Sequence, residues 1–120
     1  MSTILNVDDN MVNRKLVGTY LKRSKMFDTI LEAEDGDIAL EIINQNPNID
    51  VLLLDIYMPK MNGFEVLNSL KEKNIDIYTI VLSTDDTQDE VVLDLGAKMF
   101  LSKPVKEAEL ISVLEKLNLN

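Results

Sequence analysis

Short apolar runs alternate along the chain with longer stretches in which apolar residues recur every three or four positions. The short runs have the length and the β-branched or leucine-rich composition of strands, and they cover residues 3–7, 29–31, 51–54, 78–82 and 99–101. The longer stretches have the period of amphipathic helices, and they cover residues 11–24, the stretch between Asp35 and Pro47, residues 64–73 and 87–95, and the stretch from Leu110 to Leu117. The pattern predicts five strands, each followed by a helix.

The run at residues 51–54, Val-Leu-Leu-Leu, is apolar without alternation. Such a run is typical of a strand that is buried on both faces, as in a parallel sheet. Five successive strand–helix units predict an α/β fold, a doubly wound parallel sheet with helices on both faces and right-handed crossovers. Because the sequence shows no internal repeat, linker or low-complexity stretch, we expect one domain over residues 1–120 and no effector domain.

The composition excludes several kinds of chemistry. The chain of 120 residues has no cysteine and no histidine, which removes disulfides, thiolate ligands, most zinc sites and histidine general bases. Its 12 basic and 21 acidic residues give a net charge of −9, so we expect no nucleic-acid partner, because such a surface needs clustered basic residues. No apolar run approaches the roughly 18 residues of a membrane span, and residues 1–5 lack the basic start of a secretory signal. We therefore expect no membrane insertion and a cytoplasmic location.

Polar residues that can carry chemistry follow four of the predicted strands. In an open parallel sheet, ligands bind outside the carboxyl ends of the strands, so the residues at these ends are candidates for a site. They are Asp8 and Asp9 after the first strand, Asp55 after the third, Ser83 and Thr84 after the fourth, and Lys103 after the fifth. Taken singly, each also fits a simpler role, since aspartate and serine cap helices and turns and lysine is common on surfaces. A shared site is the interpretation that accounts for all of them together.

Three carboxylates at one edge predict a divalent cation. Each pair of like charges at about 4 Å costs roughly 4 kcal/mol at an effective dielectric constant near 20, and a hard cation offsets that repulsion. Mg²⁺ fits better than Ca²⁺, because it takes one or two carboxylates and recruits phosphate oxygens. A carboxylate nucleophile, Mg²⁺, a lysine and a hydroxyl together indicate phosphoryl transfer to an aspartate. The glycine-rich loops of nucleotide-binding proteins are absent from the sequence, which argues against a nucleotide as the donor.

Five motifs in order resemble those of a known family. They are VDDN at 7–10, DIYMPKMNG at 55–63, ST at 83–84, GA at 96–97 and SKP at 102–104. Together they resemble the CheY-like receiver domains of response regulators in two-component signal transduction, and the resemblance covers about residues 3–117. It implies a flavodoxin-like (βα)5 fold, a five-stranded parallel sheet with the strand order 2-1-3-4-5.

The resemblance also implies roles for the acidic residues. Asp55 matches the phosphoacceptor, and Lys103 matches the lysine that contacts the phosphoryl group. Asp9 matches a direct Mg²⁺ ligand, Asp8 the acidic partner that orients the water molecules of the metal, and Tyr57 a residue whose backbone carbonyl binds the metal.

Further roles concern switching and lifetime. Ser83 matches the hydroxyl that moves toward the phosphoryl group, and Phe100 matches an aromatic residue that turns inward on activation. Tyr57, Thr84 and Asp85 occupy positions beside the phosphoryl group, where we expect them to modulate how long it persists.

The expected partners follow from the same resemblance. The phosphodonor is a histidine kinase or a histidine phosphotransfer protein. The output is contact with a downstream protein through the face built by the fourth helix, the fifth strand and the fifth helix. A chemotaxis-type regulator is one of the roles that the resemblance implies. The interval from Ser83 to Lys103 is about two residues shorter than in most relatives, so we expect the fourth helix or the connection before it to be shortened. The chain itself is expected to catalyse only its own phosphorylation and dephosphorylation.

Four alternatives stay open. The stretch Asn13-Arg14-Lys15 is similar to receivers attached to hybrid sensor kinases, so the chain also fits a receiver excised from such a kinase or from a larger regulator. It also fits a phosphate-independent pseudo-receiver that acts as a binding module. The third alternative is a magnesium-dependent phosphatase, but such enzymes usually have a second aspartate two residues after the nucleophile, where this chain has Tyr57. The fourth is a flavodoxin-type cofactor site, but such a site needs a phosphate-cradling loop where this chain has Asp8 and Asp9.

Overall fold

The five predicted strands form one parallel sheet. In the computed structural model, which describes residues 2–117, the strand order is β2-β1-β3-β4-β5. The strands are β1 (Thr3–Val7), β2 (Thr29–Ala33), β3 (Val51–Asp55), β4 (Tyr78–Ser83) and β5 (Met99–Ser102). The predicted fold and strand order are therefore confirmed. The second strand is two residues longer than predicted, because Glu32 and Ala33 continue the ladder against Asn6 and Val7.

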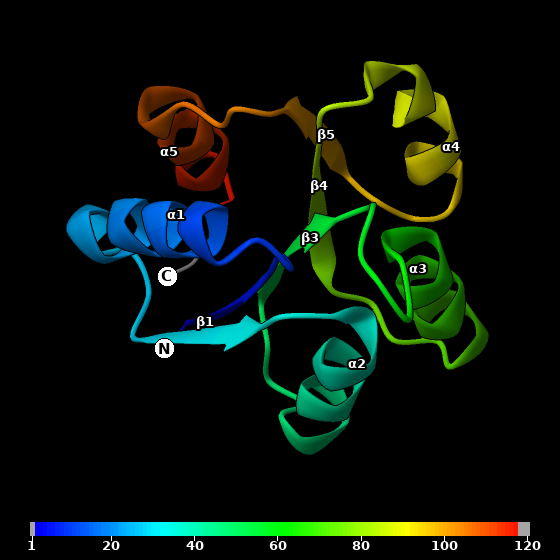
Figure 1. Ribbon diagram of the computed structural model, residues 1–120. Coiled ribbons are helices and arrows are strands. Elements are labelled where there is room, and N and C mark those ends of the chain that lie inside the picture. Colours follow the sequence, from blue (N-terminus) through cyan, green and yellow to red (C-terminus); the bar gives the residue numbers. More distant parts are fainter. Residues whose placement is uncertain (1, 118–120) are drawn as a thin grey trace.

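Helices cover both faces of the sheet (Figure 1). They are α1 (Met11–Ser24), α2 (Gly36–Gln45), α3 (Gly63–Glu72), α4 (Asp89–Asp94) and α5 (Glu107–Glu115). One cluster of buried side chains joins the sheet to α1 and α5, and a second joins it to α2, α3 and α4. Every residue of β3 is buried, as the unbroken apolar run predicted. Its side chains alternate between the two clusters, so the middle strand is the centre of the core.

The fourth helix is the main departure from the predicted elements. The pattern predicts a helix over residues 87–95, but α4 has only six residues and follows a 3-10 turn, η1 (Asp86–Gln88). The Asp85 carboxylate accepts the Thr87 N–H at 3.1 Å and so caps the turn. Gly96 follows α4 with φ of +109°, a conformation that favours glycine and ends the helix. The shortening relative to other receivers, expected from the Ser83–Lys103 interval, stays a prediction.

The start of α3 lies against the end of β3. Gly63 N–H donates to the Ile56 carbonyl at 2.7 Å, and a Cβ on Gly63 would lie 2.6 Å from the Asp55 carbonyl oxygen. Any side chain at position 63 would push α3 away from the strand end that carries Asp55. Asn62 and Glu65 form a capping box on the same helix, so its start is fixed by local hydrogen bonds.

Among residues 2–117, none of the helices has both the length and the apolar character needed to cross a bilayer.

Candidate functional site

Three aspartates meet at the carboxyl edge of the sheet. Asp8 and Asp9 follow β1, Asp55 is the last residue of β3, and the two strands are neighbours. One carboxylate oxygen of each aspartate lies within 4.8 Å of the others. Asp8 and Asp55 are buried, with 2 % and 6 % of their surfaces exposed, whereas Asp9 is exposed. The structure therefore brings together residues that are 46 positions apart in the sequence and places two of the three charges out of water.

Lys103 lies between the two buried carboxylates. Its Nζ is 2.9 Å from Asp8 Oδ2 and 3.3 Å from Asp55 Oδ2. Its backbone N–H donates to the Ser83 carbonyl at 2.9 Å, which ties the end of β5 to the end of β4, and its peptide bond to Pro104 is cis. One ammonium group therefore serves two aspartates, and the third aspartate of the cluster adds a further negative charge.

The protonation equilibria reflect this imbalance. Burial raises the pKa of Asp55 from 3.8 to about 6; Lys103 opposes the rise, and the negative charge of Asp8 adds to it. Burial alone would lower the pKa of Lys103, but the hydrogen bond to Asp8 and the charges of Asp55 and Asp8 outweigh it and raise that pKa above its ordinary value. Lys103 therefore stays protonated, while its single positive charge does not balance the negative charges of the carboxylates around it.

The donor set of the cluster fits Mg²⁺. All three candidate ligands are carboxylates, the hard oxygen donors that this ion prefers, and the net charge of three carboxylates and one ammonium leaves room for a cation. Within residues 2–117, every buried side-chain nitrogen or oxygen already has a hydrogen-bond partner, so the fit rests on charge and donor type. The role of the Tyr57 carbonyl stays a prediction.

The predicted switch residues lie in β4 and β5. Ser83 is buried at the end of β4, and its Oγ accepts the Asp85 N–H at 3.1 Å. Thr84 is exposed and lines a hollow beside Lys103. Phe100 is half-buried and packs against the cluster that contains α2, α3 and α4. Ser83 is therefore the hydroxyl at the buried edge, next to the lysine backbone, and Phe100 lies on the α4 side of the sheet.

The loops after β3 and β4 are joined by a contact that the sequence pattern did not reveal. Tyr57 Oη donates to Asp85 Oδ2 at 2.8 Å, and the Tyr57 ring packs edge-on against Phe64 with centroids 6.5 Å apart. The hydrogen bond from Tyr57 raises the pKa of its own hydroxyl, and the hydrogen bonds from Thr87 and Tyr57 lower the pKa of Asp85. Two of the three predicted modulators, Tyr57 and Asp85, thus form one bridge between these loops.

Arg14 is a second residue whose position the sequence analysis did not assign. Its side chain is only 12 % exposed and contacts both Glu32 and the backbone carbonyl of Asp8. Its place in the first turn of α1, shortly after the acidic pair, was the available signal, but a basic residue there is equally typical of a solvated helix face.

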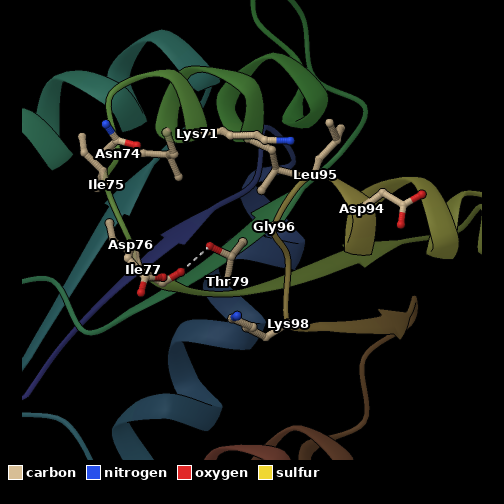
Figure 2. A pocket seen from close by; sticks show the side chains of 12 residues that line it. Lys71, Asn74, Ile75, Asp76, Ile77, Thr79, Asp94, Leu95, Gly96 and Lys98 are labelled. Atoms are coloured by element: carbon tan, nitrogen blue, oxygen red, sulfur yellow. Dashed lines mark hydrogen bonds between the residues drawn. The ribbon is translucent and has the colours of Figure 1, made fainter.

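Two hollows lie at opposite ends of the sheet. One, of about 240 Å³, opens beside Asp8 and Lys103, and its apolar wall includes Leu16 and Val105. The other, of about 340 Å³, lies between α3 and the turn at Gly96 and includes Thr79 near the start of β4 (Figure 2). Thr79 and Ser83 are four residues apart on one strand, about 13 Å. Of these two hollows, only the first therefore belongs to the aspartate cluster.

Residues 4–115 match the response regulator receiver domain family, so the chain belongs to this family. It is 39 % identical over 107 residues to a cyclic di-GMP phosphodiesterase of Thermotoga maritima, covering 86 % of this chain and 27 % of that protein. It is 30 % identical over 118 residues to the two-component response regulator ORR7 of Oryza sativa subsp. japonica, covering 95 % of this chain and 55 % of that protein. The chain thus spans about a quarter and about half of the lengths of these two relatives.

The fold is also similar to solved receiver structures. The crystal structure of the CheX-CheY-BeF3-Mg²⁺ complex from Borrelia burgdorferi has a TM-score of 0.89 and 30 % sequence identity, covering 99 % of this chain and 90 % of that chain. The chain is therefore a response-regulator receiver domain, consistent with two-component signalling.

Proposed function

We propose that Asp55 accepts a phosphoryl group from a phosphohistidine on another protein. The observation that carries this proposal is the position of Asp55, buried at the end of β3 with Lys103 at 3.3 Å and two further carboxylates beside it. Membership of the receiver family supports a two-component donor. The 120 residues contain no histidine, so the donor lies outside them.

The transfer is a simple exchange of bonds. An Oδ atom of ionised Asp55 attacks phosphorus and forms a P–O bond. The P–N bond to the donor imidazole, which is protonated on its other ring nitrogen, breaks with its electron pair left on nitrogen, so a neutral imidazole leaves. The ammonium of Lys103 stabilises negative charge on the phosphoryl oxygens. Because Lys103 has an elevated pKa, it keeps that charge at neutral pH. Water then attacks the phosphorus, the P–O bond to Asp55 breaks with its electron pair left on the carboxylate, and inorganic phosphate leaves, so the chain turns over only its own phosphoryl group.

Asp8, Asp9 and Asp55, with the Tyr57 carbonyl, are the residues that would hold Mg²⁺. Bound there, Mg²⁺ would supply the remaining positive charge for the phosphoryl oxygens. The protein contributes by holding carboxylates close together at a cost in repulsion, which makes the edge selective for a cation.

The output follows from the added charge. A phosphoryl group brings about −1.5 to −2 charge at pH 7 next to Ser83, whose hydroxyl can donate to it. Movement of Ser83 and inward rotation of Phe100 would alter the face of α4, β5 and α5, where Val91 and Leu93 are exposed. A downstream protein reads this face, and a chemotaxis-type partner is supported by the likeness to the Borrelia complex. We expect the exchange to take place in the cytoplasm.

The donor is expected to approach along α1. Met11, Val12 and Leu16 of this helix are exposed by 63 %, 72 % and 45 %, and Leu16 lines the hollow that opens beside Asp8 and Lys103. An apolar surface next to the acceptor suits a protein that must bring its imidazole to Asp55.

Intact-mass measurement after incubation with a small acyl phosphate and Mg²⁺ tests the acceptor. The wild type is expected to gain one phosphoryl group, Asp55→Asn none, and Asp76→Asn, an exposed aspartate at the other end of the sheet, the same as wild type. A wild type that gains nothing, or a gain that survives Asp55→Asn, would overturn the proposal. In the first case the chain is a phosphate-independent binding module.

A further inference from the structure

The guanidinium of Arg14 joins the acidic turn after β1 to the neighbouring strand β2. Its Nε donates to Glu32 Oε1 at 3.0 Å, and its Nη1 donates to the carbonyl oxygen of Asp8 at 2.8 Å. The side chain is 12 % exposed, so both contacts are largely shielded from water. A planar guanidinium is suited to two directed hydrogen bonds of this kind, which an ammonium group does not reproduce.

The backbone of Arg14 is fixed as well. Asn6, which is 1 % exposed in the middle of β1, donates from Nδ2 to the Arg14 carbonyl at 3.1 Å. The Arg14 N–H donates to the Asn10 carbonyl at 2.9 Å. Both ends of the residue are therefore held, and the guanidinium has little freedom to leave the Asp8 carbonyl.

The place of this contact decides what it controls. The Asp8 carbonyl belongs to the peptide unit that joins Asp8 to Asp9, so a hydrogen bond to it restrains the rotation of that peptide. The Asp8 carboxylate is held separately, since Oδ1 accepts the Asn10 N–H at 2.9 Å and Oδ2 accepts from Lys103 at 2.9 Å. Arg14 is therefore a positioning residue, because it contacts the backbone between two candidate ligands and neither carboxylate.

We propose that Arg14 orients the Asp8–Asp9 peptide so that both carboxylates face Asp55, and thereby sets the affinity of the edge for a divalent cation. The inference rests on the proposed function of that edge. The direction of the change in Mg²⁺ affinity when Arg14 is replaced distinguishes an orienting role from a purely electrostatic one. A guanidinium near three carboxylates repels a cation, so on charge alone its removal would tighten Mg²⁺ binding. If orientation dominates, its removal weakens binding.

Calorimetric titration with Mg²⁺ of the whole chain distinguishes the two effects. Arg14→Gln removes the positive charge and the two directed hydrogen bonds of the guanidinium. We expect Mg²⁺ affinity to fall about tenfold, the lower end of what loss of a ligand-orienting partner costs. Arg14→Lys keeps the charge that repels the cation but loses the two directed hydrogen bonds of the guanidinium, so its affinity should fall at least as far as that of Arg14→Gln. The matched control is Lys15→Gln, because Lys15 contacts the same Glu32 at 3.4 Å but is 63 % exposed. This control should bind Mg²⁺ as wild type does or slightly more tightly.

Phosphorylation supplies a second readout that a loss of folding does not reproduce. The Mg²⁺ concentration for half-maximal phosphorylation of Arg14→Gln by a small acyl phosphate should rise by the same factor, while the rate at saturating Mg²⁺ returns to within about twofold of wild type. If Arg14→Gln does not fold, Arg14→Lys should show at least the same loss of affinity. Glu32→Gln, which only weakens the anchor of the guanidinium, should show a smaller loss in the same direction.

The outcomes separate this inference from the proposed function. A wild type that binds Mg²⁺ and accepts a phosphoryl group, with Arg14 variants that bind as tightly as Lys15→Gln or more tightly, overturns the positioning role alone. A wild type that does not bind Mg²⁺ overturns the proposed metal site and the positioning role with it.

Discussion

The two ends of β4 carry similar residue types in different surroundings. At its start, Thr79 is 2 % exposed, and its hydroxyl donates to the nearby Ile77 carbonyl. The charged side chains of the hollow around it are exposed (Figure 2), namely Lys71, Asp76, Asp94 and Lys98. At its end, Ser83 is 1 % exposed and lies beside a carboxyl edge where Asp8 and Asp55 are buried and one lysine serves both.

The difference shows that burial, more than the residue types, determines how strongly the charges of a cluster interact and how much they affect stability. Exposed charges are screened by water, and exposed ion pairs contribute little. Buried charges retain strong interactions, and each one that lacks a partner is costly. The carboxyl edge therefore stores repulsion that a cation or a proton can relieve, whereas the opposite edge stores little. The following substitutions test this contrast.

Loss of the shared lysine should have the largest effect. Without a divalent cation at pH 8, Lys103→Met should lower the free energy of unfolding by about 3 kcal/mol, because it leaves two buried carboxylates without their counter-ion. Lys98→Met at the opposite edge should change it by less than about 0.5 kcal/mol. Urea unfolding of both variants checks the comparison. Equal effects at the two edges would contradict the role given to burial.

Neutralising the acceptor should act in the opposite direction. The folded-state pKa of Asp55 is about 6, above its ordinary 3.8, so its ionised form destabilises the fold at pH above 6, and the penalty fades as the pH falls from 6 toward 4. Asp55→Asn should therefore stabilise the metal-free protein by about 2 kcal/mol at pH 8, somewhat less than the full shift because solvent screens part of it. Urea unfolding should show that gain shrinking as the pH falls toward 4. Asp76→Asn is the control, and a destabilised Asp55→Asn at pH 8 would argue against stored repulsion.

The contrast extends to the surface. Leu16 beside the carboxyl edge and Leu93 on α4 are both 45 % exposed, which makes them a matched pair. Leu16→Gln should slow phosphotransfer from a phosphohistidine protein about tenfold, roughly 1.4 kcal/mol, without changing the rate with a small acyl phosphate. Leu93→Gln should leave both rates unchanged. A slowing of both donors by Leu16→Gln would place the defect in the site itself.

The bridge between the two loops should have the smallest effect. Tyr57→Phe removes the hydrogen bond to Asp85 but keeps the ring, and because both groups are at the surface we expect little change in stability. The loss of one such bond corresponds to about a threefold change in rate. We expect it in dephosphorylation, with phosphorylation nearly unaltered, measured by the decay of the phosphorylated mass. Equal changes in both rates would argue against a role in lifetime.

The position of the candidate site was predictable from the sequence because its main residues follow strands. Asp8 and Asp55 directly follow apolar runs, and Lys103 lies two residues after one. Parallel strands joined by right-handed crossovers bring their carboxyl ends to one edge. The extent of β2 was not predictable from its apolar run, since Glu32 belongs to the strand through its pairing with Asn6. The short length of α4 was not predictable from its apolar pattern, which predicted a helix over residues 87–95, because the 3-10 turn before it depends on the Asp85 cap.

The sequence alone determined the order of strands and helices, the central buried strand and the edge at which the acidic residues collect, because these depend on local periodicity and on the handedness of the chain. Only the tertiary structure decided which side chains touch. Lys103 reaches Asp8 and Asp55 from a different strand, Tyr57 meets Asp85 across 28 residues, and Arg14 joins Glu32 to the Asp8 carbonyl. Such contacts depend on the paths of loops and on side-chain directions, which no pattern along one segment contains.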